Sequence, residues 1–192
     1  TLSLHDALPL CCDSLKEFKG KFAAADGRCL IMDNTLIAYA YASGTTYTIP
    51  DSVTTIGKSA FNSCESLTSV TIPDSVTTIE KDAFRFCKGL ASVTIGNSVK
   101  TIGSQAFAYC TKLTSVTIPD SVTTIVGAAF YGCSSLETVY CKPTTPPTGG
   151  YNMFYGNASG RKIYVPAGSG ADYKEKQYWS DYKDYIEEDA SL

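Results

Sequence analysis

A repeat of 23 residues is the feature that most constrains the fold of this 192-residue chain. Phenylalanine, cysteine and leucine each recur at this spacing, at Phe61, Phe84, Phe107 and Phe130, at Cys64, Cys87, Cys110 and Cys133, and at Leu67, Leu90, Leu113 and Leu136. One unit of this size cannot bury its apolar side chains alone, whereas stacked units bury them in a continuous core. The period therefore predicts a solenoid of four regular repeats over residues 49–140.

Each repeat contains two short β-prone pieces and one segment suited to a helical turn. In the first repeat the β-prone pieces are residues 53–56 and 67–72, and the helical turn is expected at 59–64. Residues 50–52, Pro-Asp-Ser, are typical of a turn, because proline fixes φ and the short polar side chains bond nearby backbone. Parallel strands about 4.8 Å apart would join each repeat to the next.

Ten positions in one pass through the repeat follow a wider pattern: Cys64, Leu67, Val70, Ile72, Pro73, Val76, Ile79, Ala83, Phe84 and Cys87. This pattern resembles the 23-residue BspA-type leucine-rich repeat of bacterial surface proteins. The resemblance implies a β-rich leucine-rich repeat solenoid and a secreted or cell-surface protein that adheres to host or neighbouring cells. In one repeat Gly96-Asn97 replaces the Pro-Asp pair of the others, and we expect the turn to persist there.

The N-terminal flank divides into two parts. Residues 1–9 are similar to the translation of a sequencing-adapter oligonucleotide, so we expect residues 1–20 to be a disordered segment outside the fold and the chain to be a fragment. His5, Cys11 and Cys12 lie there, and we assign them no role. Residues 21–48 contain two apolar runs around Asp33-Asn34, which predict a β-hairpin cap on the first repeat.

The C-terminal flank is expected to close the other end of the array. Residues 141–170 form a degenerate fifth repeat with a proline-rich loop, in which Phe154 takes the phenylalanine position and Asn157 the cysteine position. Residues 171–192 contain aromatic side chains at spacings of three and four, which predict a helical cap followed by a frayed acidic end. Caps are expected because an open solenoid end exposes its core.

The regularly spaced cysteines do not predict a metal site. Zinc sites use close pairs such as C-x₂-C that converge on one ion, whereas this ladder presents one thiol per repeat. The parallel directions of the side chains also give poor disulfide geometry between neighbouring repeats. We expect buried thiols that bond the turn backbone, and the redox state of Cys29 and Cys141 stays open.

Composition and motifs argue against several classes of function. A net charge of −3 gives no electrostatic case for binding nucleic acid, and no run of apolar residues is long enough for membrane insertion in this fragment. The chain has no P-loop, dinucleotide or serine-nucleophile motif, and Asp51, Asp74 and Asp120 recur at one turn position, so they line an edge. We expect no enzyme activity, no cofactor, no metal and a monomer.

In each repeat the longer β-prone piece, equivalent to residues 67–72, is the main strand. The outward face of the main strands is the first candidate contact surface. Its members alternate with buried positions: Ser69, Thr71, Ser92, Thr94, Ser115, Thr117, Thr138 and Tyr140. Serine and threonine suit any solvent-facing strand position, so these residues are explained equally well without a binding role. The hypothesis is a non-catalytic surface that binds a protein or a glycan. The alternatives are a structural spacer in a larger surface protein and, more remotely, ice binding through the hydroxyl ladder.

A second candidate surface is the edge where the repeats differ from one another. Positions equivalent to 57–59, 62–63 and 65–66 vary among the copies while the core columns do not. Cations gather in the middle copies, at Lys81, Arg85, Lys88, Lys100 and Lys112. A solvated face explains them most simply, and contact with an acidic partner is the alternative.

Overall fold

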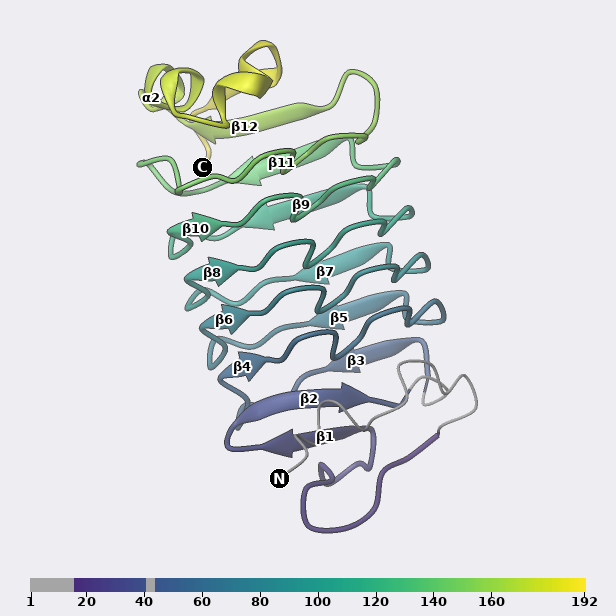
Figure 1. The fold of residues 1–192 in the computed structure, drawn as a ribbon. Helices are drawn as coiled ribbons and strands as arrows, with labels where there is room; N and C mark the ends of the chain where they lie inside the picture. Colours follow the sequence, from purple (N-terminus) through teal and green to yellow (C-terminus); the bar gives the residue numbers. More distant parts are fainter. Residues whose placement is uncertain (1–15, 41–43) are drawn as a thin grey trace.

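Stacked coils of similar shape build the molecule, with one repeat per coil (Figure 1). The structure, a computed structural model, describes residues 16–40 and 44–192. The predicted solenoid of short parallel strands is confirmed, with hairpin strands at one end and helical segments at the other. The expectations for His5, Cys11, Cys12 and residues 1–9 lie outside the described residues.

The shorter strands of the repeats form one sheet that begins at the N-terminal hairpin. Its described members, in order, are β1 (Cys29–Met32), β2 (Thr35–Tyr39), β4 (Thr55–Ile56), β6 (Thr78–Ile79), β8 (Thr101–Ile102) and β10 (Thr124–Ile125). β1 and β2 are antiparallel and are joined by Asp33 and Asn34, whose φ angles of 49° and 61° are typical of a type I′ hairpin turn. β2 then pairs parallel to β4, so the hairpin continues the ladder of the array.

The main strands stand on the opposite side of each coil and form two ladders. The first contains β3 (Thr46–Thr48), β5 (Ser69–Thr71) and β7 (Ser92–Thr94); the second contains β9 (Ser115–Ile118), β11 (Thr138–Cys141), β12 (Lys162–Pro166) and β13 (Ile186–Asp189). Among the described strands, no pairing joins β7 to β9. β7 leads into Gly96, whose backbone approaches the preceding repeat so closely that a Cβ would lie 2.4 Å from the Pro73 carbonyl oxygen.

The expected helical turn of each repeat takes the form of successive tight turns. Two positions per repeat have positive φ: one follows the column Ser59, Asp82, Gln105, Ala128 and Asn152, and the other follows Ser63, Phe86, Tyr109, Gly132 and Gly156. A residue in this left-handed region ends a helical run. Backbone N–H groups such as that of Phe61, which donates to Ala83 at 2.7 Å, then bond the next repeat.

Columns of identical side chains fill the core. Phe61, Phe84, Phe107, Phe130 and Phe154 are fully buried and stack with ring centroids 4.6, 5.0, 5.3 and 5.6 Å apart. Tyr39 and Tyr47 close this column at the N-terminal end, and Trp179 and Tyr182 close it at the C-terminal end. The caps therefore continue the core of the array and shield its two ends.

The C-terminal cap contains helix α2 (Gly170–Glu175) and the 3₁₀ helix η1 (Ser180–Tyr185). The prediction of a frayed acidic end is wrong, because β13 pairs parallel to β12 with Ile186 opposite Ile163. Its acidic side chains have partners: Glu187 bonds Lys162, and Glu188 accepts the backbone N–H of Gly170 at 2.9 Å. Backbone N–H groups of Gly168 and Gly170 lower the pKa of Glu188.

Candidate functional site

The outward side of β5, β7, β9 and β11, the strand face, holds the predicted hydroxyl side chains in two columns. Ser69 lies opposite Ser92 and Thr71 opposite Thr94, while Ser115 lies opposite Thr138 and Thr117 opposite Tyr140. These eight side chains are exposed or half-exposed, and Val70, Val116 and Val139 between them are buried. The sequence pattern thus located the outward face correctly, and the binding role of this face stays a prediction.

The strand face is longer than the sequence pattern indicated, and its chemistry changes along the axis. Thr46 and Thr48 extend the columns at the N-terminal end, opposite Ser69 and Thr71. At the other end Tyr140 stacks on Tyr164 of β12 with ring centroids 5.5 Å apart. The face therefore passes from hydroxyl groups to aromatic rings, with the break between β7 and β9 in its middle.

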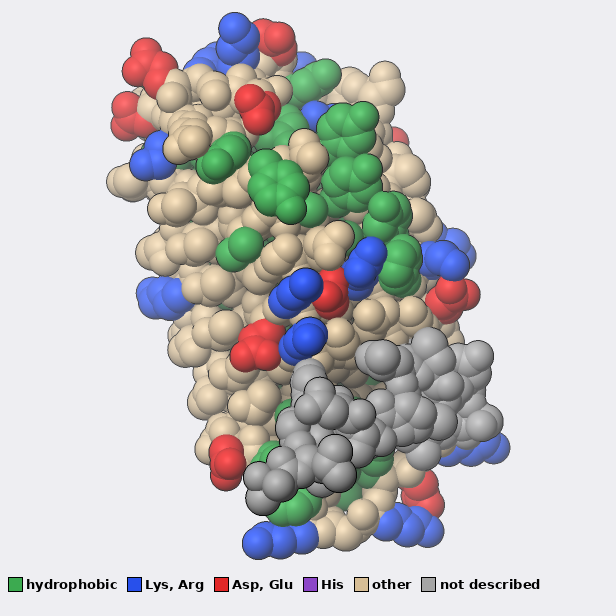
Figure 2. Space-filling view, viewed as in Figure 1, with side chains coloured by type: hydrophobic (Ala, Val, Ile, Leu, Met, Phe, Trp, Pro, Cys, Tyr) green, Lys and Arg blue, Asp and Glu red, His purple; other side chains and the backbone are tan. Residues whose placement is uncertain are grey.

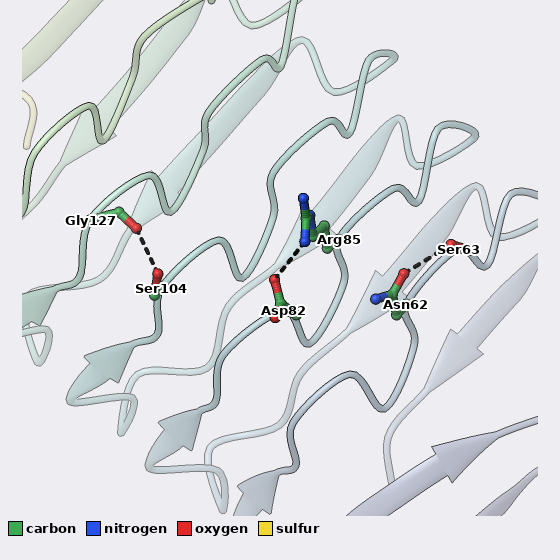
Figure 3. A network of polar contacts seen from close by, with 6 residues as sticks. All are labelled: Asn62, Ser63, Asp82, Arg85, Ser104 and Gly127. Carbon is green, nitrogen blue, oxygen red and sulfur yellow. Dashed lines mark hydrogen bonds and ion pairs between the residues drawn. The ribbon is translucent and has the colours of Figure 1, made fainter. Parts of the chain in front are cut away.

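The cations of the predicted basic edge are spread over several columns of the repeat, and the binding role of this edge stays a prediction. Lys81, Arg85, Lys88, Lys100 and Lys112 occupy five different positions of the repeat and therefore five different columns. Arg85 Nη1 lies 3.5 Å from Asp82 Oδ1 (Figure 3). Lys88 Nζ lies 2.7 Å from Glu65 Oε1. Two of the five cations thus already have an acidic partner within the chain, which weakens their attraction for another one.

Aromatic side chains on the same edge were missed by the sequence analysis. Phe86, Tyr109, Tyr131 and Tyr155, the aromatic row, follow one another across four repeats, with ring centroids 4.9, 5.4 and 5.5 Å apart. Tyr155 is 59% exposed, and the other three are half-buried. The 23-residue spacing of the first pair and the 24-residue spacing of the last pair were available as signals.

The cysteine ladder bonds the backbone as predicted. The thiols of Cys87, Cys110 and Cys133 donate to the carbonyl oxygens of the phenylalanines 26 residues earlier, at 3.0, 3.3 and 3.0 Å. Asn157 takes over this role in the fifth repeat, where its side-chain amide donates to the Phe130 carbonyl oxygen at 2.8 Å. The ladder therefore joins the turns of neighbouring repeats, and all six described cysteines are buried thiols outside any disulfide.

Burial makes these thiols unreactive. It raises the pKa of the Cys29 thiol, which also bonds the Tyr47 hydroxyl, to about 11. Burial also raises the pKa of Cys110 and of Cys141. At a pKa of about 11, roughly one-thousandth of the Cys29 thiol is thiolate at pH 8, and the thiolate is the reactive form.

We expect the six described cysteines to resist iodoacetamide in the folded protein at pH 8. In denaturant they should all react within minutes, because unfolding exposes them to the reagent. Peptide mapping by mass spectrometry would report each site separately. Rapid alkylation of Cys29 or Cys141 in the folded chain would contradict the burial described above.

An open depression lies beside the proline-rich loop, with a volume of about 750 Å³. Tyr173 and Trp179 fix this loop by donating hydrogen bonds to the carbonyl oxygens of Pro143 and Pro147, each at 2.8 Å. The charged residues that line the depression are Asp120, Lys142 and Lys176, and all three are exposed. Small-molecule sites place convergent polar groups in an enclosed apolar setting, which this depression lacks.

Residues 16–40 and 44–192 contain neither a cluster of metal-binding side chains nor a membrane-spanning helix. Within these ranges no three histidine, cysteine or acidic side chains are grouped closely enough to hold a metal ion. In the same ranges, no helix combines the length and the apolar character needed to cross a bilayer. The candidate sites are therefore the extended surfaces, the strand face and the aromatic row.

The repeat matches the BspA-type leucine-rich repeat region, with six copies over residues 36–167. The chain belongs to the BspA-type leucine-rich repeat family. This match covers the four regular repeats, most of the degenerate fifth repeat and part of the N-terminal hairpin. No curated protein matches the chain by sequence.

Solved structures similar to this BspA-type array come from several bacteria. A leucine-rich cell surface protein of Faecalibacterium prausnitzii is 28% identical with a TM-score of 0.67, over 78% of this chain and 40% of that one. A leucine-rich repeat protein of T. pallidum is 26% identical with a TM-score of 0.64, over 80% of this chain and 73% of that one. One from Bacteroides capillosus is 31% identical with a TM-score of 0.56, over 63% of this chain and 99% of that one.

Proposed function

We propose that this BspA-type array is a non-catalytic binding module of a secreted or cell-surface protein, and that its strand face contacts a protein or a glycan during adhesion. The observation that carries the proposal is the strand face, whose polar side chains stand in columns along the axis. Such an arrangement offers many contacts to an extended partner and gathers no groups around one reacting atom. The surface location of the F. prausnitzii protein supports the proposed compartment.

The test is binding of the full chain to an array of extracellular matrix proteins and glycans. A variant with Thr71→Lys, Thr94→Lys and Thr117→Lys places three long cations on the strand face, at positions that are exposed or half-exposed. We expect saturable binding by the unmodified chain and its loss in the triple variant. Binding retained by the triple variant would remove the strand face from the proposal.

A spacer role predicts a different result in the same experiment. A spacer positions another domain. The repeat solenoid itself would then show no saturable binding to any of the matrix proteins or glycans tested. Circular dichroism of the triple variant would serve as the control, because solvent-facing substitutions in strands change stability only slightly. An unfolded variant would be replaced by one with the three threonines changed to glutamate.

A further inference from the structure

Turn segments 57–66, 80–89, 103–112, 126–135 and 150–159 form one side of the solenoid, the turn edge. In the C-terminal repeats this edge carries an exposed apolar patch around the aromatic row. Among the described residues, the exposed large hydrophobic side chains are Phe22, Val126, Tyr151 and Tyr155, and the last three lie on adjoining turn segments of two repeats. The backbone N–H of Ala128 bonds the Tyr151 carbonyl, and that of Gly132 bonds the Tyr155 carbonyl. Figure 2 shows hydrophobic side chains gathered in a row on this face, above a group of charged ones.

Two residues of the aromatic row stand at a position where every repeat has a left-handed backbone. Phe86 and Tyr109 occupy the left-handed column with φ angles of 59° and 61°, where the next two repeats have Gly132 and Gly156. A bulky side chain is disfavoured in this region, and glycine is not. Neither ring enters the core, since both are half-exposed. The left-handed backbone belongs to every repeat, but a bulky residue raises its cost, and burial of these two rings does not offset that cost.

Two glycines leave room for the tyrosine rings. A Cβ on Gly132 would lie 2.8 Å from Cδ1 of the Tyr109 ring, and a Cβ on Gly127 would lie 2.8 Å from Cε1 of the Tyr151 ring. The rings therefore rest against backbone in fixed positions. Phe86 also stacks on Tyr109 and Tyr131 on Tyr155, while Tyr109 and Tyr131 meet edge to face. Fixed aromatic side chains lose little entropy on binding and are enriched among interface hot spots.

Charge divides the turn edge into an uncharged part and a cationic part. Turn segments 126–135 and 150–159 contain no charged residue. Segments 57–66, 80–89 and 103–112 contain five cations, Lys58, Lys81, Arg85, Lys88 and Lys112, against three anions, Glu65, Glu80 and Asp82. This excess of positive charge contrasts with a net charge of −3 for the whole chain. An uncharged part beside a charged one fits the apolar and polar parts of protein interfaces, and the cations outside the Arg85–Asp82 and Lys88–Glu65 pairs favour an acidic partner.

The orientation of the rings decides between a sugar and a protein. Sugars pack on ring faces, but the planes of Phe86 and Tyr109 are within 14° of parallel and those of Tyr131 and Tyr155 within 18°, so these rings turn faces toward each other. Within these two pairs, ring edges and the phenol hydroxyl groups of the tyrosines are left for a partner. Tyrosine edges of this kind, with one apolar and one polar end, are common in protein interfaces.

The spacing of the rings selects the shape of the partner. Successive ring centroids of the aromatic row are 4.9 to 5.5 Å apart along the stack, and an α-helix has a pitch of about 5.4 Å. A helix laid along the solenoid axis would therefore place one residue beside each ring. A strand in that position repeats every ~6.6 Å on one face and falls out of register.

We propose that the aromatic row docks an amphipathic helix of a protein partner, apolar at i, i+4, i+7 and i+11 and acidic at the end that meets the cationic turn segments. Helix recognition through anchors at this spacing is a recurrent mode of peptide binding. The inference rests on the proposed function in treating the array as a binding module, and it uses a different surface from the strand face.

The probe is a synthetic, fluorescently labelled peptide of about 18 residues, long enough to form a helix, with leucines at this spacing and glutamates around the first two. Control peptides carry the same residues in strict alternation, or lysines in place of the glutamates. We expect the full chain to bind the helical peptide about tenfold more tightly than either control, as judged by fluorescence anisotropy.

Variants of the protein locate the site. Tyr131→Ser with Tyr155→Ser should weaken binding about tenfold, whereas Thr71→Lys, Thr94→Lys and Thr117→Lys together should leave it unchanged. Phe86→Gly with Tyr109→Gly should weaken binding without lowering Tm, because glycine relieves the left-handed strain. A lowered Tm would assign these rings to stability and overturn the proposal.

Other outcomes separate this inference from the proposed function. Equal binding of the alternating peptide, or no loss of binding in Tyr131→Ser with Tyr155→Ser, would overturn the helix site. Binding of cello-oligosaccharides that the same tyrosine variant abolishes would overturn it in favour of a sugar. If the chain binds the matrix and glycan array through its strand face but not the helical peptide, only the present inference fails.

Discussion

Replacing Phe107 with alanine is expected to lower the free energy of unfolding by about 3–5 kcal/mol. Phe107 is fully buried, and its ring stacks between Phe84 at 5.0 Å and Phe130 at 5.3 Å. Alanine would leave a cavity in the middle of the column. Each repeat contacts only its neighbours, so this cavity also weakens the coupling between the two halves of the array.

Loss of coupling gives the Phe107→Ala prediction a second readout. Far-UV circular dichroism in urea reports the whole array, whereas fluorescence of Trp179, the single tryptophan, reports the C-terminal cap. The two transitions should coincide in the unmodified chain and separate in the variant, because the array then no longer unfolds as one unit.

Phe86→Ala is the matched control for Phe107→Ala. It removes the same side chain from the neighbouring repeat, but from a half-exposed position on the turn edge. We expect the free energy of unfolding to change by no more than about 1 kcal/mol, and the circular dichroism and fluorescence transitions to coincide. A loss of similar size in both variants would contradict the assignment of Phe107 to the core and Phe86 to the surface.

The core could be predicted from the sequence because the repeat states it several times. Each copy places a phenylalanine and a leucine at the same positions, so one correct alignment fixes every column. The same reasoning placed Asn157 at the cysteine position, and the structure gives it the hydrogen bond that Cys133 makes one repeat earlier, to a phenylalanine carbonyl oxygen. Identity of position implied identity of role.

The acidic end could not be predicted because its structure depends on contacts distant in sequence. Residues 186–189, Ile-Glu-Glu-Asp, have no local signal for a strand. They form β13 because Ile186 enters the core beside Ile163 and because Lys162 and Gly170 bond the two glutamates. A charged edge strand of this kind also discourages further pairing.

The aromatic row escaped the sequence analysis because it changes column. Phe86 and Tyr109 occupy the left-handed position, whereas Tyr131 and Tyr155 stand one residue before it, so the spacing between the two pairs is 22 residues. Alignment by column separates these residues into two sets. The pairing of Lys88 with Glu65 could have been predicted from the sequence, because these opposite charges occupy one column of the repeat, 23 residues apart. Variation between repeats located the edge but not the contacts on it.

Replacing Trp179 with alanine is expected to destabilise the chain by about 3–5 kcal/mol, the usual cost of removing a fully buried aromatic side chain. Its ring packs on Phe154 at 5.8 Å and on Tyr173 at 4.8 Å, and Nε1 donates to the Pro147 carbonyl oxygen at 2.8 Å. The substitution therefore opens the end of the phenylalanine column and releases the proline-rich loop in one step.

Trp179→Phe separates these two contributions. Phenylalanine keeps an aromatic ring over Phe154 but loses the bond to Pro147, so we expect a smaller loss, of about 1–3 kcal/mol, since the carbonyl oxygen loses its partner. Because both variants lack the tryptophan, stability is measured by circular dichroism in urea. Hydrogen exchange should show protection lost first in β12 and β13, the strands nearest the cap. If Trp179→Ala were as stable as the unmodified chain, residues 171–192 would not be closing the core of the array.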